Sequence, residues 1–344
     1  MLFVAGIGSV GSALLQQIQG VPEAAAPPLA GACTSRRAVW YDAPRPADAL
    51  DPALPEGEPT DWSRLLERME ETSRALVFVD ATGSVDVARH HARLLEAGCA
   101  IVTPSKLALT QEQGYFDRIR RAAGGEGVDR YHYETTVGAG LPVVRTLRDF
   151  LRTGDRVERV RGAASGTLSF LFNQLRSGAA FSGAVQEAIT RGYAEPDVRD
   201  DLSGEDVARK FLILGRTMGL RLERADVQVE SLVPEALRER PLGDFLDALP
   251  RLDDDWAART QAAQDDDAVL QYVGRLDDGA VRVAVEAVPE RSPFGQLTGT
   301  DNLFEFYTAR YDASPLSVRG PGAGAHVTAA GVLSDVFEVL RAAR

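Results

Sequence analysis

The sequence predicts a two-domain α/β protein, in which a doubly wound parallel sheet is followed by an α+β domain with a mixed sheet. Three observations predict it. An apolar run at the N-terminus passes through a glycine-rich turn into a helical pattern, and apolar strands then alternate with helices up to about residue 131. Beyond that point strands and helices follow each other irregularly, as in α+β domains. A length of 344 residues suits two domains.

The first predicted unit is a strand over residues 2–5, a turn with the pattern G-x-G-x-x-G, and a helix over residues 10–18. Glycines in such a turn let the backbone approach a pyrophosphate, which then lies at the helix N-terminus. Because the motif follows a strand and opens a helix, it indicates dinucleotide binding and a Rossmann-type sheet. The residues assigned to the cofactor here are Gly6, Gly8, Ser9, Val10 and Gly11.

A second strand is predicted over residues 29–34, and Arg36 and Arg37 come after it. In this fold a carboxylate at this point binds the ribose 2′-hydroxyl of NAD, whereas an arginine accommodates the 2′-phosphate of NADP. The carboxylate is missing, so Arg36 and Arg37 favour NADP over NAD. In a chain so rich in arginine the pair can also be an ordinary part of the surface, and NAD remains open.

Five prolines between residues 42 and 60 exclude a continuous helix or a central strand there, so we expect a surface excursion. Ligands of parallel sheets bind beyond the carboxyl ends of the strands. Thr82 and Lys106 each follow a predicted strand and are therefore expected beside one bound dinucleotide. The further elements of this domain are helices at 62–71 and 85–97 and strands at 76–80 and 100–103.

A helix over residues 327–340 is expected to pack back onto the first domain and make that domain discontinuous. We therefore predict a dinucleotide-binding domain of residues 1–133 and 320–344, and a substrate-binding and dimerisation domain of residues 134–319. The elements predicted in the second domain are strands at 157–164, 269–274, 281–288 and 304–308 and helices at 143–151, 168–175, 183–191, 206–218 and 253–267, after a strand at 131–135.

The basic residues are strongly biased, because all but two of the 38 lysines and arginines are arginine. The exceptions are Lys106 and Lys210. Arginine keeps its proton at any usable pH, whereas a buried lysine can lose one. A site that needs a cation that also acts as a base cannot accept arginine, so the two lysines are candidate active-site residues; chance survival is the alternative.

Lys210 stands in the densest polar segment of the chain, residues 192–210. Ser203 is expected to be the N-cap of a helix, with Asp206 completing a capping box. Asp206 and Lys210 are then four residues apart on one helical face. A solvated ion pair worth a few tenths of a kcal/mol is the alternative for the carboxylates, but an arginine would serve that purpose equally well.

Composition excludes several classes of protein. The net charge of −12 argues against a general nucleic-acid binder. Cys33 and Cys99 are too few for a disulfide scaffold or a cysteine-rich zinc site. No apolar run approaches ~18 residues, and the N-terminus lacks a basic segment typical of signal peptides. We therefore expect a cytoplasmic protein that binds neither membranes nor nucleic acid.

The four histidines offer no pair with metal-ligand spacing. His90 and His91 are expected on the exposed face of the helix at 85–97, and His132 in the core or a hinge. Ser165 and Ser169 have no plausible histidine and aspartate partners nearby, so a hydrolase triad is not supported.

Taken together, the motifs resemble homoserine dehydrogenase over nearly the whole chain. The departures are small: Ser105 stands where many members have Asn, and Val198 where Pro is common. The segments that carry the resemblance are GIGSVG (6–11), VTPSK (102–106), ETTVGAGLPV (134–143), SGTLSFLFN (165–173), GYAEPDVRDDLSGEDVARK (192–210), GTDN (299–302) and GPGAGAHVTAAGV (320–332).

The resemblance implies NAD(P)-dependent interconversion of L-homoserine and L-aspartate 4-semialdehyde by a homodimer. It implies that Lys210 transfers the proton, that Asp206 lies beside the substrate and that Glu195 binds the substrate's ammonium group. It also implies that Lys106 is the second active-site lysine, between substrate and nicotinamide. The cofactor contacts that it implies are Thr82, Lys106, Gly192 and Gly324.

The resemblance further implies a monovalent cation, usually sodium, bound by Glu134 and by the carbonyls of Val137, Ala139 and Leu141. Hard oxygen ligands suit such a cation. Many relatives carry a C-terminal regulatory domain or an N-terminal aspartokinase; neither is expected here, nor is inhibition by threonine through such a domain.

Two other classes of protein also contain such a glycine turn and remain alternative interpretations. One is a different two-domain dehydrogenase of amino-acid metabolism, such as an aspartate-semialdehyde or saccharopine-type enzyme. The former needs a nucleophilic cysteine in its substrate domain, whereas Cys33 and Cys99 both fall in the nucleotide domain. The other is an NADP-binding sensor, which the presence of both Lys210 and Asp206 disfavours.

Overall fold

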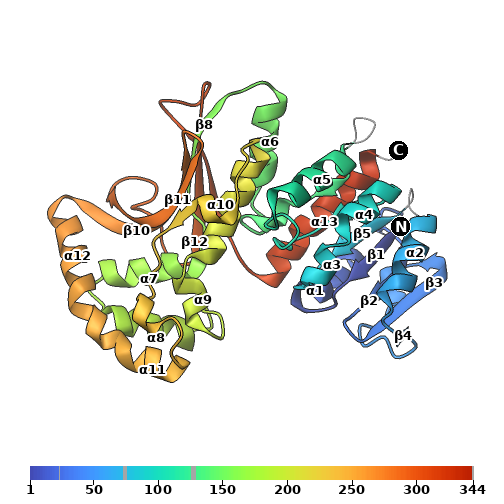
Figure 1. The fold of residues 1–344 in the computed structure, drawn as a ribbon, viewed down its shortest axis with the longest axis horizontal. Coiled ribbons are helices and arrows are strands. Elements are labelled where there is room, and N and C mark those ends of the chain that lie inside the picture. The colour runs from blue at the N-terminus through green and yellow to red at the C-terminus, as the bar shows by residue number, and fades with distance from the viewer. Residues whose placement is uncertain (23, 73–75, 125–128, 343–344) are drawn as a thin grey trace. The chain divides into compact units, whose positions relative to one another are not determined.

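The computed structural model describes residues 1–22, 24–72, 76–124 and 129–342 (Figure 1). It divides the chain into two compact units. The first contains residues 1–140 and 323–344, and the second contains residues 141–322. The chain thus leaves the first unit once and returns to it with its last helix.

The first unit is built on a seven-stranded sheet with the order β4-β3-β2-β1-β5-β6-β7. Parallel pairing joins the five strands from β2 to β7, which confirms the predicted Rossmann-type sheet. The central strand β1 is fully buried, as expected of an apolar run covered on both faces. The strands are β1 (Leu2–Ala5), β2 (Leu29–Cys33), β3 (Arg37–Arg45), β4 (Glu58–Pro59), β5 (Val77–Asp80), β6 (Ala100–Val102) and β7 (Tyr131–His132).

The antiparallel strands β3 and β4 extend one edge of this sheet and were not part of the predicted pattern. The prolines misled the prediction, because they exclude a central strand but not one near an edge. Pro44 lies beyond the continuous part of the β2–β3 ladder, where the register shifts between Leu29 and Gly31. Gly31 also allows β3 to pack closely against β2, because a Cβ at Gly31 would lie 2.2 Å from the carbonyl oxygen of Val39.

The C-terminal helix α13 packs against α1 within the first unit. Leu14 and Ile18 of α1 share one buried cluster with Val332 and Val336 of α13 and with the strands between them. The helices of this unit are α1 (Ser9–Gln19), α2 (Trp62–Thr72), α3 (Val85–Ala88), α4 (His91–Ala97), α5 (Gln113–Ala123) and α13 (Ala325–Ala342), with 3₁₀ turns at Ala47–Ala49 and Glu134–Thr136.

The second unit contains a six-stranded mixed sheet with the order β13-β12-β8-β10-β11-β9. All its pairs are antiparallel except β11 with β9, which confirms the predicted mixed sheet. The prediction missed β9 and β13, which lie at the two edges of the sheet. The strands are β8 (Val157–Ala163), β9 (Val227–Val229), β10 (Ala268–Asp277), β11 (Ala280–Pro289), β12 (Asp301–Thr308) and β13 (Leu316–Pro321).

Helix α10 packs on this sheet through a close contact with β10. A Cβ at Gly274 would lie 2.1 Å from the ring of Phe211, so glycine is what lets the helix approach. The helices of the unit are α6 (Val143–Arg152), α7 (Gly166–Arg176), α8 (Phe181–Thr190), α9 (Val198–Leu202), α10 (Glu205–Thr217), α11 (Leu242–Ala248) and α12 (Asp253–Asp265), with 3₁₀ turns at Arg224–Asp226, Glu235–Leu237 and Leu249–Leu252. Among the described residues, no helix combines the length and apolar character needed to cross a membrane.

Candidate active site

The glycine turn of the first unit joins β1 to α1, and packing demands glycine at two of its positions. Gly6 has φ of +90°, and a Cβ at Gly11 would lie 1.9 Å from the carbonyl oxygen of Gly6. Gly8 is different, because nothing lies within 4 Å of the Cβ position there. It precedes Ser9 as the N-cap of α1, and no side chain caps the helix. The turn therefore leaves backbone N–H groups of Ser9 and Val10 at a helix N-terminus suited to a pyrophosphate.

The structure separates the two arginines that follow β2. The guanidinium of Arg37 donates to the carbonyl oxygens of Pro55 (3.1 Å) and Gly57 (3.0 Å), so it ties the proline-rich segment to the sheet. Thr34 Oγ1 accepts the backbone N–H groups of Arg36 (3.2 Å) and Arg37 (3.1 Å) and fixes the turn. The side chain of Arg36 is exposed. Arg36 is therefore the better candidate for a 2′-phosphate contact.

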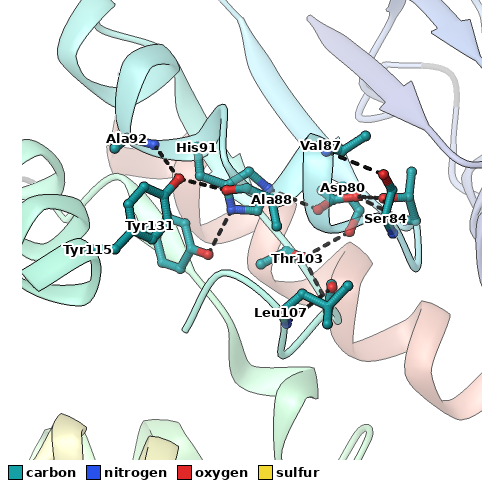
Figure 2. Close-up of polar contacts among 12 residues, drawn as sticks. Asp80, Ser84, Val87, Ala88, His91, Ala92, Thr103, Leu107, Tyr115 and Tyr131 are labelled. Atoms are coloured by element: carbon teal, nitrogen blue, oxygen red, sulfur yellow. Dashed lines mark hydrogen bonds and ion pairs between the residues drawn. The ribbon is translucent and has the colours of Figure 1, made fainter. Parts of the chain in front are cut away.

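Polar side chains gather where β5 and β6 end (Figure 2). Asp80 closes β5, and its Oδ1 accepts the backbone N–H (2.9 Å) and the hydroxyl (2.6 Å) of Thr82. Thr103 donates its hydroxyl to the carbonyl oxygen of Asp80 (2.8 Å) and accepts the N–H of Ser105 (2.9 Å). The next residue, Lys106, is half-buried, and its carbonyl accepts from the Thr110 hydroxyl. Thr82 and Lys106 thus each follow the carboxyl end of a strand of one sheet, and their contact with one bound dinucleotide stays a prediction.

His91 corrects the sequence analysis, which expected it on an exposed helical face. The predicted helix at 85–97 is broken into α3 and α4, and His91 begins α4 with 0% exposure. Its ring lies between Asp80 Oδ2 (2.9 Å from Nε2) and the hydroxyl of Tyr131 (2.9 Å from Nδ1). A uniform helical periodicity placed the wrong face outward because the chain turns at Arg89 and His90.

The expected cation ligands fall on both sides of the unit boundary. Glu134 is 7% exposed and its backbone N–H donates to Asp335 Oδ2 (3.1 Å). Val137 ends the 3₁₀ turn, and Ala139 has φ of +53°, which turns the backbone sharply. These residues offer a buried carboxylate and carbonyl oxygens, a donor set that fits a hard monovalent cation. Leu141 belongs to the second unit, where its carbonyl accepts the N–H of Val143 (2.8 Å).

A second group of ligand-type atoms lies close to Glu134. His132, Asp335 and Glu338 each offer a ligand atom within 4.8 Å of the others. His132 Nε2 lies 3.0 Å from the carbonyl oxygen of Asp129, and Nδ1 lies 3.8 Å from Glu338 Oε2. Sequence spacing could not reveal this group, because α13 brings two of its members from some 200 positions away.

Helix α10 carries the pair that the sequence predicted. Lys210 is 8% exposed, and its Nζ lies 2.7 Å from Asp206 Oδ2 and donates to the carbonyl oxygen of Ala164 (2.6 Å). Ala164 directly precedes Ser165, whose Oγ caps α7. Ser203 is not the N-cap expected: α10 begins after Gly204 with φ of +75°, where a Cβ would lie 1.9 Å from the Tyr272 hydroxyl. The side chain of Ser203 still accepts the N–H of Glu205.

The loop before α10 adds a carboxylate that the sequence analysis did not assign. Asp201 Oδ2 accepts the backbone N–H of Glu195 (2.8 Å). Burial raises the pKa of Asp201, and the negative charges of Glu195 and Asp206 raise it further. Asp201 lies on the short helix α9, and its place only six residues after Glu195 was the available signal. The loop begins at Gly192, which has φ of +69°.

Each unit carries its own group of candidate site residues. The first unit has the glycine turn, Thr82 and Lys106 at the carboxyl ends of its strands, and also contains Gly324, which has φ of +114° just before α13. In the second unit Lys210 pairs with Asp206, and Asp201 lies near enough to Glu195 and Asp206 for their charges to raise its pKa.

Comparison with known proteins assigns both units to one family. Residues 6–133 match the family model for the NAD-binding domain of homoserine dehydrogenase, and residues 142–337 match the homoserine dehydrogenase model. The homoserine dehydrogenase of Paracoccidioides brasiliensis is 38% identical over 98% of this chain and 97% of its own length. A maize chloroplastic bifunctional aspartokinase/homoserine dehydrogenase is 43% identical over 83% of this chain, which spans only 31% of that protein.

Solved structures agree on the fold. A Candida auris protein of unknown function is 33% identical, with a TM-score of 0.92 and coverage of 99% of this chain and 98% of its own. A mutant of a hyperthermophilic archaeal homoserine dehydrogenase in complex with NADPH has a TM-score of 0.75 at 21% identity, over 99% of this chain and 97% of its own. With two family models matching almost all of its length, the chain belongs to the homoserine dehydrogenase family.

Proposed function

We propose that this chain catalyses the NAD(P)-dependent interconversion of L-homoserine and L-aspartate 4-semialdehyde, a step of threonine and methionine biosynthesis. The observation that carries the proposal is the environment of Lys210. Its ammonium is nearly buried between Asp206 and the carbonyl oxygen of Ala164, within the residues that match the homoserine dehydrogenase model. A lysine so held can transfer a proton at a fixed position.

Lys210 is the group that exchanges a proton with the hydroxyl on C4 of homoserine. Unprotonated, its Nζ accepts the hydroxyl proton during oxidation, and in the reverse direction it returns that proton to the aldehyde oxygen. The carbonyl oxygen of Ala164 accepts one N–H of Lys210 and so fixes where the Nζ lone pair points. The nicotinamide cofactor supplies the hydride acceptor when it is bound.

The carboxylates of the second unit contact the amino-acid substrate. Glu195 binds its ammonium group and Asp206 lies beside the substrate, while the half-buried Asp201 holds the loop by accepting the backbone N–H of Glu195. Lys106, the second lysine, contributes positive charge toward the substrate and the nicotinamide.

The remaining assignments belong to the same proposal. Residues 1–133 with 320–344 form the dinucleotide-binding domain, which prefers NADP through Arg36. Residues 134–319 form the substrate-binding domain, through which two chains assemble as a homodimer in the cytoplasm. Glu134, Val137, Ala139 and Leu141 are the proposed ligands of a sodium ion.

The test is homoserine-dependent reduction of NADP and of NAD, followed by absorbance, with aspartate semialdehyde and the reduced cofactors in the reverse direction. We expect turnover in both directions and a higher kcat/KM with NADP. A folded sample that reduces neither cofactor would contradict the proposed activity.

A further inference from the structure

A series of buried hydrogen bonds in the first unit runs from Tyr131 through His91 to Asp80 (Figure 2) and continues to Thr82. The Tyr131 hydroxyl lies 2.9 Å from His91 Nδ1, and His91 Nε2 lies 2.9 Å from Asp80 Oδ2. Asp80 Oδ1 accepts both the backbone N–H and the hydroxyl of Thr82. Tyr131, His91 and Asp80 are completely buried. A buried charge held in this way needs a reason beyond packing, because burial of a carboxylate is costly.

The direction of each hydrogen bond follows from the chemistry of the groups. An ionised Asp80 can only accept, so His91 carries a hydrogen on Nε2. In the neutral ring Nδ1 is then an acceptor, and the Tyr131 hydroxyl donates to it. Burial raises the pKa of Tyr131 well above its usual value, so that hydroxyl keeps its proton. This arrangement satisfies every polar side-chain atom from Tyr131 to Asp80 and permits only one orientation of the carboxylate.

The oriented carboxylate determines how Thr82 can bind a ligand. A free threonine hydroxyl rotates to suit its partner. Here its hydrogen is committed to Asp80, while its oxygen accepts the N–H of Ser84 at 3.3 Å. Thr82 is half-buried, so its remaining lone pair is available as an acceptor.

The Thr82 loop also packs directly against the glycine turn. A Cβ at Gly6 would lie 2.7 Å from the carbonyl oxygen of Ala81 and 3.0 Å from Thr82 Cγ2. A dinucleotide on the glycine turn therefore passes beside Thr82. Since Asp80 touches only protein groups, any effect it has on such a ligand acts through Thr82.

We propose that Asp80, oriented by His91 and Tyr131, is a positioning residue that holds the Thr82 hydroxyl as a hydrogen-bond acceptor for a hydroxyl or amide donor of the dinucleotide. This inference rests on the proposed function, because it takes the ligand of the glycine turn to be a nicotinamide dinucleotide. It assigns a role to three buried residues that the proton-transfer step does not use.

The test is the Kd of NADPH, measured by its fluorescence, for the wild type and for variants whose folding is checked by thermal unfolding. Thr82→Val removes the acceptor and should raise Kd about tenfold, whereas Thr82→Ser should restore it. Asp80→Ala should raise Kd similarly. The double variant should bind no more weakly than Thr82→Val alone, because both changes remove the same contact.

The histidine and tyrosine provide matched controls. His91→Gln keeps an N–H donor for Asp80 and should retain the wild-type affinity for NADPH. His91→Met lacks the donor and should bind NADPH several-fold more weakly. Tyr131→Phe removes one hydroxyl and keeps the ring, so NADPH affinity should fall by a smaller factor. This variant takes the place of Asp80→Ala if that protein does not fold. The KM for homoserine should stay unchanged throughout.

A purely structural network would lower the unfolding temperature and leave Kd unchanged. Folded Thr82→Val and Tyr131→Phe variants with wild-type Kd would therefore overturn the inference. So would a double variant of Thr82 and Asp80 whose Kd rises by the product of the two single effects. A wild type that binds neither NADPH nor NADH would overturn the proposed function together with it. If the wild type binds NADPH but does not oxidise homoserine, the proposed reaction is contradicted. Weaker NADPH binding by the variants of that protein would still support the positioning role.

Discussion

The two units build their sites in different ways. The first unit gathers residues from loops at the ends of separate strands and supports them with a buried network that spans 51 positions of the chain, from Asp80 to Tyr131. The second unit places Asp206 and Lys210 four residues apart on one helix, close to a carbonyl group. We therefore propose a division of labour, in which the first unit mainly determines cofactor affinity and the second carries the proton transfer.

The largest effect is expected from Lys210→Arg. Arginine keeps the charge and the pairing with Asp206 but cannot give up its proton. We expect kcat to fall ~10²–10⁴-fold, the range that general acid–base catalysis contributes, with an unchanged Kd for NADPH. Arg209→Lys, one position earlier on α10, is the matched control and should keep wild-type kcat. Steady-state kinetics of both variants make the comparison, and near-normal turnover of Lys210→Arg would rule out this base.

The glycine turn offers a second contrast, between Gly8 and Gly11. A Cβ at Gly8 meets nothing in the protein, so Gly8→Ala should fold normally. It should raise the Kd of NADPH ~10–100-fold, the equivalent of one lost hydrogen bond to a charged group. A Cβ at Gly11 would overlap the carbonyl of Gly6, so Gly11→Ala should lower the unfolding temperature itself. Equal behaviour of the two variants in binding and thermal unfolding would refute this distinction.

Arg36 and Arg37 test cofactor choice within the first unit. Arg36→Ser should reduce the preference for NADP over NAD about tenfold, because one charged contact to phosphate is lost. Arg37→Ser should leave the preference unchanged and lower the unfolding temperature, since Arg37 holds the carbonyls of Pro55 and Gly57. Ratios of kcat/KM for the two cofactors provide the measurement. A change of preference confined to the Arg37 variant would reverse the assignment.

Asp201 gives the smallest effect and one that depends on pH. Burial raises its folded-state pKa above the unfolded value of ~3.9. The stability it contributes is therefore fully present below the unfolded pKa and is lost as pH rises through the folded pKa. Asp201→Asn should unfold at a higher temperature than the wild type at neutral pH, and this advantage should shrink toward pH ~4. Its kcat/KM for homoserine should fall; an advantage independent of pH would contradict the buried-charge account.

The same contrast explains what the sequence could predict. The pair on α10 was predictable because helical spacing is local, and the glycine turn because its neighbours form a strand and a helix. Lys106 and Lys210 were marked by composition, since arginine replaces lysine at every other basic position. The strands β4 and β9 and the short helix α9 are too short for periodicity to reveal.

The buried network of the first unit was not predictable in the same way. His91 contacts Asp80 and Tyr131 only because two parallel strands bring them to one helix start, and periodicity placed the ring outside. The cluster of His132, Asp335 and Glu338 depends likewise on the return of α13. Arg37 was indistinguishable from Arg36 until the proline-rich segment showed which carbonyls it holds.

The division of labour is tested most directly by measuring two quantities on the same two variants, Asp80→Ala and Lys210→Arg. The quantities are the Kd of NADPH and the single-turnover rate of NADP reduction at saturating NADP and homoserine. The account predicts that Asp80→Ala raises Kd with little change in rate, and that Lys210→Arg slows the rate ~10²–10⁴-fold with unchanged Kd. A Lys210→Arg protein that reduces NADP at the wild-type rate would contradict it.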